Sequence, residues 1–346
     1  TFFLGVLIFI DDYFNCLAVG SVMRPVTDTK RVSRAKLAFI IDATAAPVCM
    51  IAPISSWAAA VSQYAEGTGY NGLELFIQAI PYNFYSLLAL CFVVMLILMR
   101  FDYGPMVRFE RNAIRHGDVH TVIPEQVMQE LEEKGPYRGK LADLVVPVIM
   151  LIALETFALV YVGGIFEGKS FADALSATDA TVGLPWGAII ALVLAVVFYR
   201  IRGVLSFRAA MRCIPEGFIA MVPAILILTL ATALKNVTSA LEAREFIAFH
   251  MEHSAAGLVN FLPAVIFVVA GILAFSTGTS WATFGILIPI VVSTFDPTSP
   301  LMFIGMSACL AGAVCGDHCS PISDTTIMAS AGGQCNHLNH VQTQLP

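Results

Sequence analysis

Acidic and hydroxyl-bearing residues gather at three places where long apolar runs of the sequence are interrupted. These places are residues 11–15 (Asp-Asp-Tyr-Phe-Asn), residues 276–281 (Ser-Thr-Gly-Thr-Ser-Trp) and residues 316–325, which include two aspartates and several hydroxyl groups. Carboxylates inside a membrane segment are costly and by default functional. Hydroxyl and carbonyl oxygens are hard ligands that suit a small hard cation. The three places therefore predict a cation site on unwound backbone, which at membrane depth must line a cavity or be buried in protein.

The adjacent carboxyl groups of Asp11 and Asp12 carry the most specific chemistry. Two neighbouring carboxylates cannot both ionise cheaply in a low dielectric, so we expect at least one to hold a proton. A carboxylate holds either H⁺ or Na⁺, and competition at one group would couple the two ions in opposite directions. The alternative is that these residues end a helix at the cytoplasmic interface.

The other candidates each have a structural alternative. Asp42 lies in an apolar run that contains Pro47 and Pro53, and a packed proline kink is as good an interpretation as a polar helix face. The hydroxyl groups of residues 276–281 could equally form a helix-packing seam. The predicted ion- and proton-binding residues are Asp11, Asp12, Asn15, Asp42, Thr279, Ser280, Asp317, Ser320, Ser323 and Asp324.

Three further groups are interpreted as structural or rejected. Asp143 and Glu155 are expected to pair with other polar groups inside the membrane. Cys315, His318 and Cys319 lack the four ligands of a structural zinc site. We therefore expect no cofactor and no metal beyond a transported cation.

Composition decides the class of protein. The chain has 346 residues, of which 58% are hydrophobic and only 13% charged, against roughly 45–50% and 25% in soluble domains. Its net charge of −6 offers no basic field for nucleic acid. The eight cysteines form no Cys-x-x-Cys pair. The sequence predicts an all-α polytopic membrane protein.

Apolar runs predict about eight membrane segments, because a span needs about 20 mostly apolar residues. They cover residues 1–20 (partial), 37–61, 75–99, 141–162, 183–199, 214–234, 257–294 and 301–316. Sixteen of the 19 basic residues lie in residues 24–36, 100–140 and 200–212, so these segments are predicted to be cytoplasmic. The centre of the second, residues 124–134, is expected to form a short surface helix.

A weak internal repeat indicates how the segments are organised. A shift of 305 residues places Asp12 on Asp317, and in both copies an apolar run meets an aspartate and then a polar tail. Residues 24–36 contain five basic residues and residues 329–346 none, which predicts that the tails face opposite sides. Inverted repeats with broken helices are typical of transporters that bind substrate near the midplane.

The predicted organisation has four parts, and the chain looks cut at both ends. They are a first repeat (1–99), a cytoplasmic connector (100–140), linking spans (141–212) and a second, inverted repeat (213–346).

Five segments resemble the NhaC-type sodium/proton antiporter family of the ion-transporter superfamily. They are residues 9–15, 20–28, 33–38, 41–47 and 316–326. The resemblance implies a secondary antiporter rather than an enzyme, with inverted repeats, discontinuous helices and an elevator-like moving part. It also implies that an upstream counterpart of residues 276–281 is missing. The expected activity is Na⁺/H⁺ exchange with Asp12 and Asp317 as pseudo-symmetric carboxylates.

Two alternatives stay open beside Na⁺/H⁺ exchange. Some similar proteins exchange organic anions such as malate and lactate; no Lys or Arg lies inside a predicted span, but helix N-termini could hold an anion. An intramembrane aspartyl protease would also use two aspartates, yet Val314 replaces the first glycine of its Gly-x-Gly-Asp motif.

The location and partners follow from the same interpretation. We expect a multi-pass protein of the cytoplasmic membrane. Its partners are the lipid bilayer, Na⁺ and H⁺, not nucleic acid, and a homodimer remains open.

Overall fold

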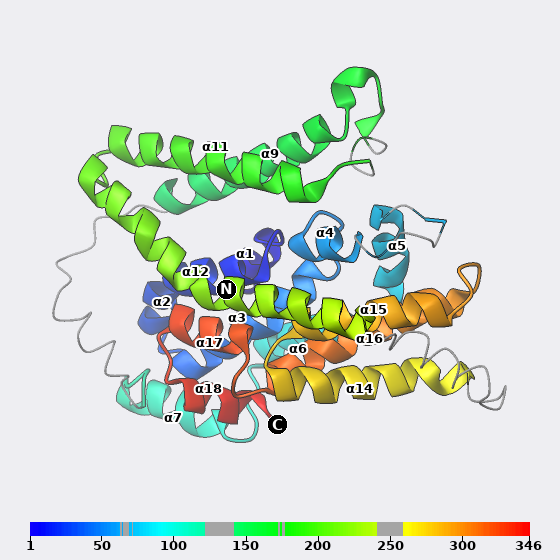
Figure 1. Ribbon diagram of the computed structural model, residues 1–346. Helices are drawn as coiled ribbons and strands as arrows, with labels where there is room; N and C mark the ends of the chain where they lie inside the picture. The colour runs from blue at the N-terminus through cyan, green and yellow to red at the C-terminus, as the bar shows by residue number, and fades with distance from the viewer. Residues whose placement is uncertain are drawn as a thin grey trace.

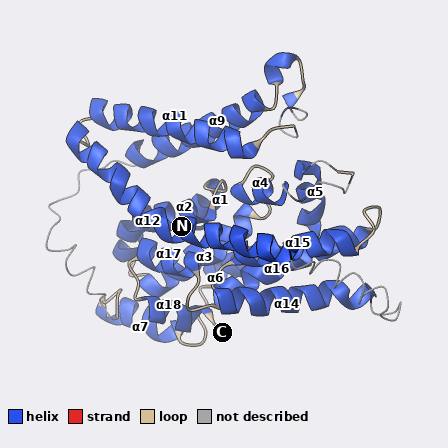
Figure 2. Ribbon diagram, viewed as in Figure 1, coloured by secondary structure: helices blue, strands red, loops and turns tan. Residues whose placement is uncertain are grey.

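The computed structural model describes residues 1–62, 64, 69–70, 72–121, 142–171, 174, 177–240 and 259–346, and every regular element in these ranges is a helix. Figures 1 and 2 show the arrangement. The first half contains α1 (Phe2–Leu7), α2 (Asp12–Thr29), α3 (Arg34–Cys49), α4 (Ser56–Ser62), α5 (Gly72–Ala79), η1 (Ile80–Tyr82), α6 (Phe84–Met99), α7 (Met106–His116) and α9 (Ala142–Val162). The second contains η2 (Ile165–Glu167), α11 (Ala180–Ile201), α12 (Phe207–Ala240), η3 (Val259–Phe261), α14 (Leu262–Thr277), α15 (Ser280–Thr294), α16 (Pro300–Cys319), α17 (Asp324–Gly333) and α18 (His337–Gln344).

The all-helical fold is confirmed, whereas eight separate membrane segments are not. Within the described ranges, three helices are long and apolar enough to cross a bilayer: Val145–Val162, Val182–Ile201 and Pro300–Cys319. A fourth span is available if α5, η1 and α6, which bend by 56°, are taken together. Other expected spans are divided into shorter helices; for example, residues 37–61 split into α3 and α4. The short surface helix expected at residues 124–134 lies outside the described residues.

The chain breaks at all three places where polar residues interrupt apolar runs. Asp11 caps α2 by accepting a hydrogen bond from the backbone N–H of Phe14, and Ser323 caps α17 in the same way. Gly278 ends α14 in a left-handed conformation (φ +67°), which glycine adopts without steric cost. Pro321 follows the end of α16, as its missing N–H requires.

The break at Gly278 is the tip of a hairpin. A Cβ atom at Gly312 or Gly316 would meet the carbonyl oxygens of Phe267 or Gly271, so α14 runs parallel to α16. Gly305, near the start of α16, lies against Phe295 after the end of α15, so α15 runs in the opposite direction. Within the 38-residue uncharged run 257–294, the described residues 259–294 therefore turn back on themselves instead of crossing once.

Close glycine contacts also join α2 to α17. A Cβ atom on Gly20 would lie 2.3 Å from the backbone carbon of Gly332, and a Cβ atom on Gly332 would meet the carbonyl oxygen of Cys16. Such small residues let two helices approach closely inside a membrane. The N-terminal ends of α2 and α17 are thereby brought together.

The expectation that the two polar tails face opposite sides is wrong in this structure. The Nη1 atom of Arg34 donates to the carbonyl oxygen of Gly333 at 3.0 Å. The end of α17 thus lies beside the α2–α3 turn, within the segment predicted to be cytoplasmic. Parallel packing of α2 and α17 is the physical reason, and the absence of Lys and Arg from residues 329–346 does not reveal it. The charge difference therefore lends no support to an inverted repeat.

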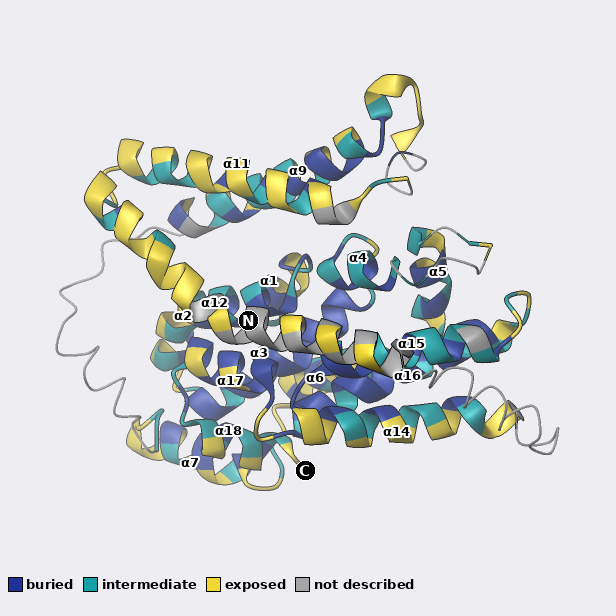
Figure 3. Cartoon of the chain, viewed as in Figure 1, coloured by how far each residue is buried: buried dark blue, intermediate teal, exposed yellow. Residues whose placement is uncertain are grey.

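Helices α9 and α11 form an antiparallel arm with an exposed apolar surface (Figure 3). Asp143 pairs with the Nε atom of Arg202 at 2.9 Å, as expected for a structural acid. Glu155 is buried, but its Oε2 atom has no hydrogen-bond partner among the described residues. The predicted pairing of Glu155 with another polar group is therefore not found at Oε2.

Candidate functional site

Asp12 is fully buried at the first turn of α2. Trp57 of α4 donates from Nε1 to its Oδ2 atom at 3.0 Å. The backbone N–H of Tyr13 lies 3.2 Å from Oδ1. The N-terminal end of a helix favours an acidic side chain, and this position together with Trp57 fixes one carboxylate deep in the protein.

Tyr13 connects α2 to the second break. Its hydroxyl group donates to Oδ2 of Asp324 at 2.7 Å, although the two residues are 311 positions apart in the chain. Asp324 stands in the first turn of α17, as Asp12 does in α2. Asp12 and Asp317 also lie near the Tyr13 side chain. Asp12, Asp317 and Asp324 are here called the carboxylate cluster.

Asp317 is fully buried in the last turn of α16. Thr325 of α17 donates to its Oδ2 atom at 3.4 Å, whereas Oδ1 has no hydrogen-bond partner among the described residues. Ser280, Ser323, Asp324 and Asp42 lie near this carboxylate. The described residues show no ion pair from Lys or Arg to any member of the carboxylate cluster.

Several further buried oxygen atoms near the breaks have no hydrogen-bond partner among the described residues. They are Oγ1 of Thr279, Oγ of Ser280 and Oδ1 of Asn15. Buried polar atoms are normally paired. Thr279 lies beside Asp324 and Ser280 beside Asp317, and unpaired oxygens next to carboxylates form a donor set that suits a cation. The described residues contain no group of three or more His, Cys, Asp or Glu placed to hold one metal ion. A bound cation would therefore combine one or two carboxylates with hydroxyl or amide oxygens.

Other predicted site residues have structural partners. Ser320 donates to the carbonyl oxygen of Phe275 at 2.8 Å and ties the end of α16 to α14. Ser323 caps α17, and Asp11 caps α2. The Nδ2 atom of Asn15 holds the end of α1 through the carbonyl oxygens of Gly5 and Ile8, at 2.8 and 2.7 Å.

Asp42 lies in a separate hydrogen-bonded neighbourhood on α3. Its Oδ2 atom accepts hydrogen bonds from Thr326 at 2.9 Å and from Gln344 at 2.7 Å, and it lies 3.2 Å from Nε2 of His340. His318 is 3.9 Å from Oδ1. These partners hold Asp42 as a junction between α3, α17 and α18.

Aromatic side chains pack beside the carboxylate cluster. Trp57, Trp281 and Phe284 pack with ring centroids 5.0–5.3 Å apart, and Tyr13 stacks on Trp281 at 6.4 Å. Tyr13 and Trp57 are also the hydrogen-bond donors to Asp324 and Asp12. Apolar surroundings of this kind strengthen electrostatic interactions.

Sequence reasoning missed the residues that connect the carboxylates. They are Tyr13, Trp57, Trp281, Thr325, Thr326, His340 and Gln344. Tyr13 and Thr325 each follow a predicted aspartate, and that adjacency was an available signal. His340 and Gln344 come from the opposite end of the chain to Asp42, and no local pattern indicates that contact.

Comparison with known proteins identifies relatives but no solved structure. The profile described as the Na+/H+ antiporter family matches residues 48–346. An uncharacterized protein of Haemophilus influenzae is 36% identical over 98% of this chain, and the chain spans 65% of that relative's length. The malate-2H(+)/Na(+)-lactate antiporter of Bacillus subtilis is 32% identical over 78 residues, 22% of this chain and 17% of its own. No solved structure matches.

Proposed function

The chain belongs to the Na⁺/H⁺ antiporter family, and from this premise we propose that it exchanges Na⁺ for H⁺ across the cytoplasmic membrane. Family membership indicates a transporter rather than an enzyme, which sets the aspartyl protease alternative aside. One observation carries the proposal: Asp12, Asp317 and Asp324 are buried around Tyr13 and have no Lys or Arg partner among the described residues. Unpaired buried carboxylates are costly and persist where an ion neutralises them.

The proposed mechanism is competition between Na⁺ and H⁺ at this cluster. An ionised carboxylate offers two oxygens to Na⁺, and Thr279 and Ser280 supply neutral oxygen ligands beside Asp324 and Asp317. Oδ1 of Asn15, three residues after Asp12 on α2, is the third proposed neutral ligand. A protonated carboxyl group loses its charge and its affinity for Na⁺. Tyr13 and Trp57 hold the carboxylates in place during the exchange, because each donates a hydrogen bond that does not depend on the transported ion.

The proposal also requires that the carboxylate cluster opens alternately to the two sides of the membrane. Residues 24–36, 100–140 and 200–212 face the cytoplasm and the chain crosses the membrane several times. The first repeat (1–99) and the second (213–346) each contribute a broken helix to the site. Movement of one part against the other would expose the cluster to each side in turn.

Exchange of an organic anion is the second candidate, favoured by the partial similarity to the malate-2H(+)/Na(+)-lactate antiporter. The N-terminal ends of α2, α15 and α17 meet at the cluster, and helix N-termini bind anions. One observation weakens this second candidate. Within the described residues, no Lys or Arg forms an ion pair with the carboxylate cluster, so no basic side chain is shown there that could bind an anion. Counterflow of labelled malate or lactate, with and without Na⁺, distinguishes the two functions.

The test of Na⁺/H⁺ exchange is proton flux in proteoliposomes containing the full-length protein. Na⁺, Li⁺, K⁺ and malate are each added to vesicles that hold a pH gradient. We expect Na⁺ to dissipate the gradient and Asp317→Asn to abolish the effect. Asp296→Asn is the matched control, because Asp296 is an exposed carboxylate whose hydrogen bonds go to Thr298.

The two outcomes are separable. A folded Asp317→Asn protein with normal Na⁺-driven flux would remove Asp317 from the mechanism. A response of the wild-type protein to malate alone would replace the proposed substrate.

A further inference from the structure

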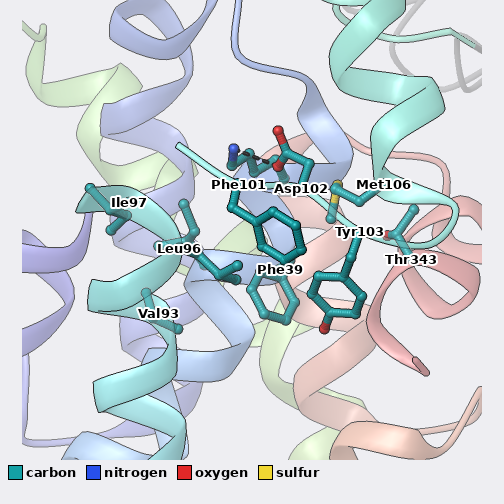
Figure 4. Close-up of a pocket in the computed structure, with 11 residues that line it drawn as sticks. Phe39, Val93, Leu96, Ile97, Phe101, Asp102, Tyr103, Met106 and Thr343 are labelled. Carbon is teal, nitrogen blue, oxygen red and sulfur yellow. Dashed lines mark ion pairs between the residues drawn. The ribbon is translucent and has the colours of Figure 1, made fainter. Parts of the chain in front are cut away.

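The connector helix α7 has two chemically different faces. Its inner face buries Met106, Phe109 and Ala113 against α3, α6 and Cys335. The only acid of the helix, Glu110, also points inward, where it accepts a hydrogen bond from the backbone N–H of Ser33 at 2.7 Å and lies 3.7 Å from Nζ of Lys36. Figure 4 shows Met106 on this inner side, beside the ion pair between Asp102 and Lys36.

The outer face of α7 carries a row of arginines. Arg108, Arg111 and Arg115 follow one another at three- and four-residue spacing, so they share one side of the helix. All three are exposed, and no ion pair to any of them occurs within the described residues. Because Glu110 points inward, the outer face of α7 itself carries basic side chains and no acid.

These arginines line a groove of about 420 Å³. Its walls are formed by Gly104, Val107, Arg108, Arg111, Asn112, Arg115, His116 and Thr121. The nearest acid, Asp118, is already bound: Asn112 donates to its Oδ2 atom at 2.8 Å and the backbone N–H groups of Thr121 and His120 donate to Oδ1. The hydrogen bonds, that from Thr121 above all, hold the pKa of Asp118 below its usual range. Asp118 is therefore ionised at the edge of the groove. It offsets one of the three positive charges of the row and leaves a net positive charge.

The groove lies close to the end of a membrane helix. Leu98 and Met99, the last residues of α6, are 77% and 67% exposed, and α7 begins at Met106. Ile114 adds an exposed apolar side chain to α7 itself, at 59%. A basic helix with exposed apolar side chains, directly after a membrane segment, is placed to contact anionic lipid headgroups.

We propose that the groove of Arg108, Arg111 and Arg115 binds the phosphate headgroup of an anionic phospholipid in the cytoplasmic leaflet. Guanidinium groups bind phosphate oxygens in pairs, and the three arginines around one groove supply more positive charge than the single negative charge of a phosphodiester headgroup requires. Binding there would hold α7, and through Glu110 the α2–α3 turn, at the membrane surface. This site is separate from the carboxylate cluster and does not depend on which ion is exchanged.

The experiment compares melting of the full-length purified protein in phosphatidylcholine micelles with increasing phosphatidylglycerol. We expect phosphatidylglycerol to raise the melting temperature of the wild-type protein, and at least a tenfold higher concentration to be needed for Arg108→Gln/Arg111→Gln/Arg115→Gln. The matched control is Arg200→Gln/Arg208→Gln/Arg212→Gln, which removes three exposed arginines from another basic segment. We expect this control to respond like wild type.

Three results would overturn the proposal. They are indifference of the wild-type protein to phosphatidylglycerol, an equal loss in both triple variants, and an equal shift with inorganic phosphate, which would indicate a soluble anion. If the first triple variant does not melt cooperatively even in phosphatidylcholine, Arg111→Gln alone is compared with Arg208→Gln. A weaker response of Arg111→Gln then supports the site, and equal responses contradict it.

Discussion

Two regions of this molecule hold acids that are buried or partly buried, and the surroundings of these acids differ. Around the α2–α3 turn, Asp28 pairs with Arg34 at 2.6 Å, and Lys36 lies between Asp102 at 2.6 Å and Glu110 at 3.7 Å. In the carboxylate cluster, the donors to Asp12, Asp317 and Asp324 that the described part of the chain provides are neutral ones such as Tyr13, Trp57 and Thr325. An acid with a permanent cation partner stabilises the fold, whereas an acid without one can take up an exchangeable ion.

The largest expected effect is at Asp12. Asp12→Asn should lower Na⁺-driven proton flux at least about a hundredfold, as expected when a buried charge partner worth about 3 kcal/mol is lost. Melting should change little, because asparagine keeps an oxygen for the bond from Trp57. Flux in proteoliposomes and melting in detergent measure the two effects. If Asp12→Asn shows the same Na⁺-driven proton flux as the wild-type protein, Asp12 stabilises the fold and does not take part in transport.

The glycine contact between α2 and α17 should have the next largest effect. Gly20→Ala places a Cβ atom 2.3 Å from the backbone of Gly332, and overpacking of this kind costs about 2–3 kcal/mol. Both the melting temperature and the flux should fall, since this contact aligns Asp12 with Asp324. Gly217→Ala is the control, because nothing lies within 4 Å of its new Cβ atom. A Gly20→Ala protein as stable as wild type would contradict the close packing.

Glu110→Gln tests the region around the α2–α3 turn, where the acids pair with Arg34 and Lys36. It removes one charge from Lys36, which keeps Asp102, so we expect a loss of about 1–2 kcal/mol in stability. Flux per folded molecule should not change, in contrast to Asp12→Asn. Melting and flux of the same preparation measure both quantities. A large loss of flux with normal melting would mean that paired acids also take part in transport.

The smallest expected effect is at Tyr13. Tyr13→Phe removes the 2.7 Å hydrogen bond to Asp324, and a bond to a charged group corresponds to about a tenfold change in apparent Na⁺ affinity. Tyr199→Phe is the control, since that hydroxyl group bonds to the backbone of Asp143 on the arm. Na⁺ titration of flux separates the variants. Equal apparent Na⁺ affinities of Tyr13→Phe and Tyr199→Phe would show that the Tyr13 hydroxyl group has no role in ion binding and that its ring serves only in packing.

Local patterns predicted the breaks, because each depends on a few adjacent residues. These residues are Gly278, Pro321 and the N-cap Asp11. Each one ends or begins a helix through the backbone preference of its own residue type, which can be read from the sequence. The assembly of the site was less accessible, since the bond from Tyr13 to Asp324 joins residues 311 positions apart. The partners of Asp42 were missed for the same reason. The relative direction of α2 and α17 depends on glycine packing, and a count of basic residues does not report it.

The hairpin tip and the loop after α16 are fastened to each other through their backbones. The N–H group of Asp324 lies 3.2 Å from the carbonyl oxygen of Gly278, and a Cβ atom on Gly278 would strike the carbonyl oxygen of Ile322. We expect two segments joined in this way to move together during the proposed exchange. Under that proposal, α14, α15, α16 and α17 would move as one unit that contains Asp317 and Asp324, and the change of access would occur between this unit and the rest of the protein.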